Sequence, residues 1–573
     1  MSHALHATAV ILALALPLGL AALWSAPPLR AVVGGLAPWS PLPALLLALF
    51  AEPGSSVHLD WLLLGTRFGL TDVTRVFLLF TALLWLGAGI YARGYLREDP
   101  RRPRFELLWL LTLAGNLMLI LALDVVSFYA GFALMTFAAY GLVIHTGKPQ
   151  ALRAGRVYLA MAVLGEGLIL AGLLLAIGEA DAGIQPLLAA LPAAVATSDQ
   201  RDLLIALLWL GFGVKAGLPL LHLWLPLAHP VAPVPASAVL SGAMIKAGLL
   251  GWLHTLPIGL VSLPGWSTLV IAAGLVAAFG AAFLSLHQEH PKTVLAYSSI
   301  SQMGLITVGV GMALQEPDLR HLLVAAIAVY ALHHGLSKGA LFLGVGIARH
   351  PGRLAGPLLW LLLALPALSL AGVMTSGVVA KLGLKAALDT QAALPDWWEH
   401  LPRLLELAAV GTTLIMARYL WLLRSESQGD RAPFSSWAGW LLLLASGPVL
   451  VFLPGQWELV DRDAITSGDW VSLTWPVLLG TALALIGARV LRPWPIPPGD
   501  LLALITPRPE TVARIRVPTT RALRFVLGLL DPARIVSRHR HNDFLRPDRF
   551  WQRESTLAYA VLLVLLLAAT LLL

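Results

Sequence analysis

Sixteen stretches of mostly apolar residues follow one another along the chain and constrain its fold more than any other feature. A membrane-spanning helix needs about 20 apolar residues. Only 12% of the 573 residues are charged and 58% are hydrophobic, a composition that excludes an ordinary soluble domain. We therefore predict an all-α polytopic membrane protein of about 16 transmembrane helices. The predicted spans are 4–25, 31–51, 72–95, 105–122, 124–144, 153–177, 203–224, 234–256, 262–286, 293–314, 322–348, 357–388, 403–423, 434–453, 471–491 and 556–573.

The first seventy residues contain the weakest of these spans. Pro38, Pro41 and Pro43 interrupt the second span, and 52–71 is too polar to cross a membrane, which leaves a short hairpin as its expected structure. The N-terminus lacks the basic region and small-residue cleavage site of a signal peptide, so we expect the first span to be retained.

Charges in the loops alternate with span number. Loops after the third, fifth, eleventh and thirteenth spans are basic, beginning with RGYLREDPRRPR (93–104). Loops after even-numbered spans lean acidic, as with Asp199 and Asp202, or Glu316 and Asp318. Because cytoplasmic loops collect Lys and Arg, the alternation places the odd-numbered loops in the cytoplasm. It predicts a multi-pass protein of the bacterial cytoplasmic (inner) membrane with both termini on the periplasmic side.

The segment 492–555 differs from the rest because it is rich in Arg and Pro. Within it, Ala522, Phe525, Val526 and Leu529 keep one helical face apolar, which predicts an amphipathic helix on the cytoplasmic membrane surface or against partner subunits. RHRHNDFLRPDRF (538–550) raises the alternatives of nucleic-acid or metal binding, but a basic segment next to a membrane is better explained by lipid headgroups.

Ionisable residues inside the spans are the candidate functional groups. A charged side chain in hydrocarbon costs about 3 kcal/mol on insertion scales, so it needs a buried partner or a function. The proposed ion path consists of Glu166, Lys215, Lys246, His333, His334, Lys338, Lys381 and Lys385, with Asp124, His222 and His254 as weaker candidates. The competing interpretation is that the lysines extend to the membrane surface and each histidine is a packed, hydrogen-bonded residue.

Lysine suits a proton relay for a physical reason. Burial disfavours its charged form and a nearby carboxylate favours it, so moving the carboxylate switches the lysine between loaded and unloaded states. Adjacent His333 and His334, with Lys338 one turn further on, can bridge between such lysines. His222 and His229 have no carboxylate at ligand spacing, and we predict no metal site.

Two Gly-rich, lysine-bearing segments lie in the two halves of the chain, GFGVKAGLP (211–219) and SGVVAKLGLK (376–385). Interrupted spans at matching places are typical of inverted repeats with a site at the membrane midplane. The predicted units are N-terminal helices (1–104), a first inverted repeat (105–256), a second inverted repeat (262–423), C-terminal core helices (434–491), the amphipathic segment (492–555) and a last transmembrane helix (556–573).

Several motifs resemble those of one protein family. HLWLPLAHPVAPVPASAVLSGAMIKAG (222–248), PKTVLAYSSISQMGLITVGVG (291–311), HHGLSKGALFLGVG (333–346) and TSGVVAKLGL (375–384) are similar in sequence and order to the antiporter-like proton-conducting subunits. These subunits occur in respiratory complex I, Mrp cation/proton antiporters and membrane-bound hydrogenases. The resemblance runs from about Asp124 to Leu388 and implies a 14-helix core with two inverted five-helix repeats and broken helices 7 and 12.

The resemblance also implies roles for individual residues. Lys215 matches the broken-helix lysine of the first half-channel, and Lys246 the lysine bridging toward the centre. His334 and Lys338 match the central pair, and Lys381 the terminal ion-exchanging residue. The chain departs from the family at FYAGFALM (128–135), where Ala133 replaces the usual glutamate, and at Leu227 and Ser337. We hypothesise that Glu166 replaces that glutamate, although a structural carboxylate is the alternative.

The sequence thus predicts a subunit that translocates protons, or alternatively Na+, within a complex I-, hydrogenase- or Mrp-like assembly. No flavin, quinone or Fe–S motif is present and the chain has no cysteine, so we predict no cofactor, and any redox chemistry belongs to partner subunits. Two alternatives stay open: a membrane subunit that energises a soluble, carbonic-anhydrase-like partner for inorganic-carbon uptake, and a scaffold subunit that does not pump.

Overall fold

The computed structural model describes residues 3–490, except 64, 180–186, 353–355, 374–375, 390–395, 427–430 and 451–466, together with 496–498. Thirteen stretches of the described chain are helical, long and apolar enough to cross a membrane. Nearly all of the described elements are helices, and the predicted all-α polytopic membrane fold is confirmed. Apart from 496–498, the predicted amphipathic segment (492–555) and the last predicted span (556–573) lie outside the described residues.

The N-terminal region contains the prolines that interrupt the second predicted span. Helix α1 (His3–Leu23) is followed by α2 (Arg30–Leu36) and α3 (Leu42–Phe50), with a 3-10 turn at Ala37–Trp39 between the latter two. Strands β1 (Ser56–Leu59) and β2 (Thr66–Gly69) then form an antiparallel hairpin in which Ser56 pairs with Gly69. The hairpin expected from the polar segment 52–71 is present.

The elements up to residue 255 hold the first predicted repeat, and one predicted span divides in two. The helices are α4 (Asp72–Tyr95), α5 (Arg102–Leu121), α6 (Val125–Val143), α7 (Pro149–Glu179), α8 (Leu191–Thr197), α9 (Arg201–Ala216), α10 (Trp224–Val231), α11 (Val234–Val239) and α12 (Ile245–Thr255). The predicted span 203–224 becomes α9 and the start of α10, because Gly217 adopts a left-handed conformation (φ 86°) that ends α9.

A second predicted span is also interrupted in the later half of the chain. The helices are α13 (Pro264–Leu286), α14 (Pro291–Gln315), α15 (Arg320–Arg349), α16 (Pro357–Ala371), α17 (Ser376–Asp389), α18 (Leu401–Leu423), α19 (Phe434–Leu450) and α21 (Ser467–Val490). Gly372 (φ 103°) ends α16 in the way that Gly217 ends α9, so the predicted span 357–388 comprises α16 and α17. The inverted-repeat relation itself stays a prediction.

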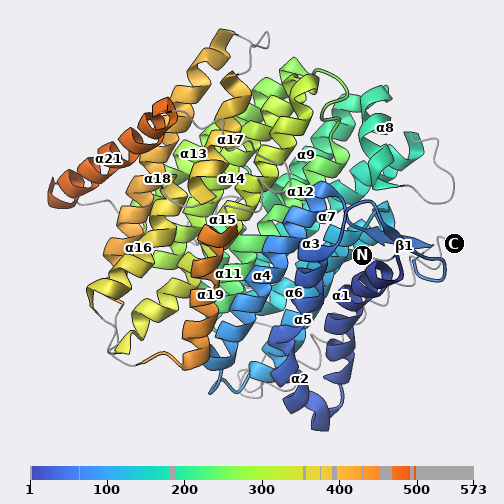
Figure 1. Ribbon diagram of the computed structural model, residues 1–573, viewed down its shortest axis with the longest axis horizontal. Helices are drawn as coiled ribbons and strands as arrows, with labels where there is room; N and C mark the ends of the chain where they lie inside the picture. Colours follow the sequence, from blue (N-terminus) through green and yellow to red (C-terminus); the bar gives the residue numbers. More distant parts are fainter. Residues whose placement is uncertain are drawn as a thin grey trace, which may run out of the picture. The chain divides into compact units, whose positions relative to one another are not determined.

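Helices α14 and α15 occupy the interior of the described bundle (Figure 1). Every residue of α14 from Pro291 to Leu314 is buried, and it packs against α10, α13, α15 and α18. A helix covered on all sides can carry polar side chains without exposing them to lipid. These two helices therefore supply the protein-lined surroundings in which ionisable groups can be retained.

A π-turn at Leu240–Met244 joins α11 to α12 and packs directly on α15. A side chain on Gly242 would place its Cβ 2.8 Å from the carbonyl oxygen of Gly335, and one on Gly335 would lie 2.7 Å from the carbonyl oxygen of Gly242. The two backbones approach this closely only because both residues are glycine. The contact holds the segment that precedes Lys246 against the part of α15 that carries His334.

Contacts between loops agree with the charge alternation. His145 Nε2 lies 2.9 Å from Asp99 Oδ2, which joins the loops after the third and fifth predicted spans. Arg349 Nε lies 2.5 Å from Glu426 Oε2, and this ion pair joins the ends of the eleventh and thirteenth predicted spans. On the other side, the Trp266 indole donates to Asp202 at 2.9 Å and joins the start of the ninth predicted span, which follows the eighth loop, to the loop after the sixth span. Within these contacts, odd-numbered loops meet odd-numbered loops and even meet even.

The first prediction concerns the glycine contact. Gly242→Ala should lower the free energy of unfolding by about 1–3 kcal/mol, because the added methyl group overpacks a contact with a backbone carbonyl. Gly280→Ala is the matched control, since a Cβ at Gly280 would meet nothing within 4 Å. Thermal unfolding of the purified protein in detergent measures both. A Gly242→Ala variant that melts with the wild type would show that the two backbones are not held this closely.

The second prediction concerns the pair formed by Asp99 and His145. Burial acts to raise the pKa of Asp99, but hydrogen bonds from His145 and from the Arg101 N–H outweigh it and hold that pKa below its ordinary value. Burial lowers the pKa of His145, and Asp99 opposes that shift only in part. Both folded-state values lie below the ordinary ones, so the unfolded chain binds protons more readily. The stabilisation is therefore complete above the ordinary histidine pKa of 6.5 and is lost as the pH falls.

Asp99→Asn should accordingly cost about 1–2 kcal/mol near pH 7.5. Because the Asp99 carboxylate favours the protonated form of His145, this cost should be kept or should grow as the pH falls toward 5, and it should shrink only below the ordinary Asp pKa of 3.8. Asp60→Asn provides a control, because the Asp60 side chain is 87% exposed. Unfolding midpoints measured across this pH range test the sign. A cost that vanishes between pH 7.5 and 5 would contradict it.

Candidate functional site

Lys215 lies in the last turn of α9 and is buried among aromatic side chains. Its Nζ is 3.4 Å from the Tyr158 hydroxyl oxygen. It also lies 5.4–5.8 Å from the ring centroids of Phe132, Tyr158 and Trp224. Aromatic faces at this distance attract an ammonium group, most strongly when water is excluded. The aromatic side chains therefore provide a site in which Lys215 can be held in its charged form.

Glu166 on α7 lines the same small cavity as Lys215. The cavity also contains the Thr136 side chain and has a volume of about 10 Å³, close to the space that one water molecule occupies. Glu166 interacts electrostatically with Lys215 across it. The structure thus brings together the two residues that the sequence paired. Phe132 and Thr136, which flank Ala133 in the sequence, face the same space.

The break between α9 and α10 lies directly after Lys215. Residues 218–223 form turns, and the Trp224 indole at the start of α10 donates to the Val214 carbonyl at 2.9 Å. His222 lies in these turns with its Nδ1 3.3 Å from the Leu218 carbonyl and its ring edge-on to Tyr297. The turns position His222 within the break, beside a helix end that presents main-chain carbonyls to the interior.

Lys246 is fully buried in the first turn of α12. Its Nζ donates to the Ser241 carbonyl at 2.7 Å, inside the π-turn. A π-turn widens the helix and leaves carbonyls accessible to side chains, and such turns are frequent at functional sites. Lys246 interacts electrostatically with both His334 and Lys338 on α15. The sequence predicted these three residues, and the structure places them in one cluster.

The next groups continue this cluster toward α17. Lys338 Nζ donates to the Leu295 carbonyl of α14 at 3.1 Å. His333 Nδ1 is 2.9 Å from Ser376 Oγ and 3.4 Å from Ser337 Oγ. Since a hydroxyl can donate or accept, Nδ1 of His333 is satisfied in either tautomer. Ser376 is the first residue of α17, so His333 connects α15 to the helix that carries Lys381.

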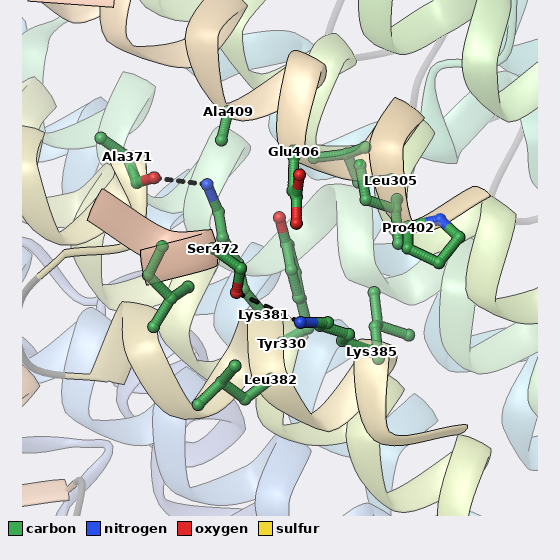
Figure 2. Close-up of a pocket in the computed structure, with 13 residues that line it drawn as sticks. Leu305, Tyr330, Ala371, Lys381, Leu382, Lys385, Pro402, Glu406, Ala409 and Ser472 are labelled. Atoms are coloured by element: carbon green, nitrogen blue, oxygen red, sulfur yellow. Dashed lines mark hydrogen bonds between the residues drawn. The ribbon is translucent and has the colours of Figure 1, made fainter. Parts of the chain in front are cut away.

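Lys381 and Lys385 line a cavity of about 50 Å³ at the far end of this series. Figure 2 shows Lys381 Nζ hydrogen-bonded to the carbonyl of Ala371, the last residue of α16, and Lys385 Nζ bonded to Ser472 Oγ at 3.3 Å. The C-terminal end of a helix carries partial negative charge and favours a cation. The Lys381 side chain lies across Gly372, where a Cβ would be 2.5 Å from its Cδ.

Two buried residues near the series were not predicted from the sequence. Lys292 Nζ donates to the Ala232 carbonyl at the end of α10 and lies 3.5 Å from Ser237 Oγ. His229 stacks on Phe342 with ring centroids 4.6 Å apart, and it interacts electrostatically with Lys292 and Lys338. Lys292 comes just before the predicted span 293–314 and so resembles a loop charge. The proline-rich run around His229 was the available signal.

The weaker candidates occupy other positions. Asp124 caps α6: Oδ1 accepts the Ser127 N–H and Oδ2 accepts the Arg67 N–H, both at 2.8 Å. This is the behaviour of a structural N-cap. His254 lies in the last turn of α12, edge-on to Phe128. Over the described part of the chain, no three His, Asp or Glu side chains lie close enough to hold a metal ion.

Comparison with known proteins identifies the family. Residues 122–384 match the family model described as NADH:quinone oxidoreductase/Mrp antiporter, TM. NADH-quinone oxidoreductase subunit N of Ectopseudomonas mendocina is 30% identical over 410 residues, which cover 66% of this chain and 79% of that protein. Hydrogenase-4 component B of Escherichia coli (strain K12) is 29% identical over 312 residues, which cover 52% of this chain. The chain spans about half the length of that relative, 45%.

A solved structure supports the fold. The structure of the Mrp complex from Dietzia sp. DQ12-45-1b contains a chain that superimposes with a TM-score of 0.65 at 20% identity. The superposition covers 84% of this chain and 99% of that one. The matched family segment begins near α6 and ends in α17, and so contains Glu166, Lys215, Lys246, His334 and Lys381. The chain belongs to the NADH:quinone oxidoreductase/Mrp antiporter family of transmembrane proteins.

Proposed function

We propose that this chain is a proton-translocating subunit of a larger membrane complex. The observation that carries the proposal is the series of buried ionisable side chains on elements that pack in turn, α7 on α9, α9 on α12, the π-turn before α12 on α15, and α15 on α17. The series runs from Glu166 and Lys215 through Lys246 to His334 and Lys338, and then by His333 to Lys381 and Lys385. Buried ionisable residues inside a membrane protein are costly and are typical of proton relays.

Backbone carbonyls make these lysines suitable for proton exchange. Lys246, Lys338 and Lys381 each donate to a main-chain carbonyl. A carbonyl can accept a hydrogen bond from a neutral amine as well as from an ammonium group, because both forms retain N–H donors. A lysine held in this way can therefore gain or lose its proton without leaving a buried acceptor unsatisfied.

In this proposal, Glu166 replaces the glutamate that the family usually has at the position of Ala133. It shares the cavity with Lys215 and interacts with it electrostatically. When Glu166 is ionised it favours the charged form of Lys215, and when it is protonated or moves away that support is lost. The first half-channel thus retains a carboxylate–lysine pair, with the carboxylate supplied by α7 and not by α6.

Protons suit this series better than Na+. Sodium, like other hard cations, is held by oxygen ligands, and an ammonium group in the same space repels it. The described members of the series are five lysines and two histidines, with Glu166 as the carboxylate of the first cavity. We therefore assign protons as the transported ion. Na+ flux in a transport assay would contradict this assignment.

The partners and the orientation belong to the same proposal. Sequence relatives named as subunits of NADH-quinone oxidoreductase and hydrogenase-4 favour a membrane assembly with redox partners. Inner-membrane placement with periplasmic termini follows from the charge alternation. A soluble carbonic-anhydrase-like partner and a scaffold that does not pump are the rival functions.

Isolation of the tagged complex from mild detergent, followed by mass spectrometry, separates these functions. We expect other membrane subunits together with redox subunits. Recovery of a large zinc carbonic-anhydrase-like protein would instead make the chain the membrane half of a carbon-uptake system. Recovery of the small subunits of a cation/proton antiporter would favour Na+ as a transported ion.

The third prediction concerns Lys215. Lys215→Ala should reduce proton flux in proteoliposomes containing the complex by about tenfold or more, because the first half-channel loses its exchanging group. Lys148→Ala is the matched control, since Lys148 is exposed in the loop after α6. Folding is followed by detergent size-exclusion profile. Unchanged flux in a folded Lys215→Ala complex would remove Lys215 from the path and favour the scaffold function.

The fourth prediction concerns Glu166. Glu166→Gln keeps the shape of the side chain and removes its charge, so flux should fall by about tenfold if Glu166 modulates Lys215. Glu179→Gln, at the exposed end of the same helix, should leave flux unchanged. Normal flux in Glu166→Gln would assign this carboxylate a structural role.

A further inference from the structure

The cavity at Lys381 differs from the cavity at Lys215 in size and in its polar groups. At about 50 Å³ it has room for about three to four water molecules, whereas the other cavity has room for about one. Its polar lining combines Lys381 and Lys385 from α17, Tyr330 from α15, Ser472 from α21 and Glu406 from α18. Figure 2 shows Glu406 projecting into the space that Lys381 and Lys385 face.

Glu406 was not predicted as a functional residue, and its surroundings are unusual for a surface carboxylate. Its side chain is only 18% exposed. Oε2 accepts the Trp475 indole N–H at 3.2 Å and lies 3.4 Å from Nη1 of Arg403, which is itself 72% exposed. These two contacts orient the carboxylate, and the cavity provides its connection to the two lysines.

The position of Glu406 relative to the helix ends indicates which side of the membrane the cavity serves. Lys385, Glu406 and Ser472 each lie within about one and a half turns of a helix end, at the C-terminus of α17 and the N-termini of α18 and α21. These ends adjoin loops after even-numbered predicted spans. The cavity therefore lies between Lys381 and the side opposite the Asp99–His145 and Arg349–Glu426 contacts, here called the outer side.

We propose that Glu406 is a proton-exchanging residue that connects Lys381 to water on the outer side. The inference rests on the proposed function and adds a residue and a route to it. A proton passes from the Lys381 ammonium through cavity water to the Glu406 carboxylate, leaving a neutral amine and a carboxylic acid. Loss of the proton to outer water then restores the carboxylate, and the same steps run in reverse for uptake.

The polar residues around the cavity differ in what they contact. Lys385, hydrogen-bonded to Ser472, lines the cavity with Glu406, and Arg403 lies 3.4 Å from the Glu406 carboxylate. The Tyr330 hydroxyl donates its proton to Gln302 Oε1 at 2.9 Å. The Tyr330 oxygen can therefore accept a hydrogen bond from water in the cavity. Glu406 is thus the carboxylate of the outer port, and Trp475 and Arg403 orient it.

Flux measurements test the role of the carboxylate. In the complex reconstituted in proteoliposomes, Glu406→Gln should reduce proton flux by about tenfold or more, and Glu406→Asp should restore much of it. Glu399→Gln, at an exposed carboxylate just before α18, is the matched control and should retain the flux. Wild-type flux in Glu406→Gln, or equal losses in Glu406→Gln and Glu399→Gln, would overturn the proposal.

Cysteine labelling tests the water route without relying on transport. The chain has no native cysteine, so single-cysteine variants can be used directly. Ser472→Cys should react with a charged, membrane-impermeant methanethiosulfonate added from the outer side, in the same vesicles in which Asp202→Cys, at an exposed outer position, reacts. Ser301→Cys, buried between α13 and α14, should not react.

The two assays separate the two proposals. If the wild-type complex moves no protons, the proposed function fails, while labelling of Ser472→Cys still reports whether the cavity meets outer water. If Ser472→Cys is not labelled, or is labelled only from the side of the Asp99–His145 contact, the outer port is wrong even where proton flux through the complex is intact.

Discussion

The structure depends on how buried ammonium groups are satisfied. A lysine in hydrocarbon costs several kcal/mol unless hydrogen bonds replace the lost water. Here the acceptors are main-chain carbonyls: Ser241 in the π-turn for Lys246, Leu295 for Lys338 and Ala371 at the end of α16 for Lys381. Regular helices keep most of their carbonyls occupied, so the π-turn and the end of α16 are suitable places to hold Lys246 and Lys381, whereas Leu295 lies within the regular helix α14. The helix breaks at Gly217 and Gly372 therefore change the direction of the chain and also leave main-chain carbonyls free to accept hydrogen bonds.

That requirement explains why the interior of the bundle is built from closely packed backbone. A break that frees carbonyls is tolerated in a membrane only where protein or water surrounds it. The π-turn meets this condition by packing against α15 through Gly242 and Gly335. Helix α14, buried along its length, supplies the Leu295 carbonyl and packs against α10, α13, α15 and α18. Helices such as α7 and α13, which carry fewer of these groups, leave more of their apolar surface exposed.

Much of this arrangement could be predicted from the sequence, and the parts that could not have physical reasons. Hydropathy located the spans, and glycine and proline indicated the breaks near Lys215 and Lys381. The π-turn has no such local signal, because it depends on the contact between Gly242 and Gly335. Lys292 and Glu406 lie at the ends of helices, where a charge in the sequence resembles one in a loop. Only the packing of α10 over Lys292, and of α21 beside Glu406, reveals that both side chains face the interior.

A carboxylate lies near each end of the series of buried ionisable residues. Glu166 lies beside Lys215 at one end and Glu406 shares the cavity of Lys381 at the other, while Lys246 and Lys338 of the central cluster are bonded to neutral carbonyls. Positive charges repel one another strongly in a low-dielectric interior, so this central cluster favours a single excess proton. A carboxylate at each end can stabilise a charged lysine there without adding charge to the centre. Under the proposed function, a proton admitted at either end would therefore raise the free energy of a second one in the middle, and this repulsion would couple the two ends of the series.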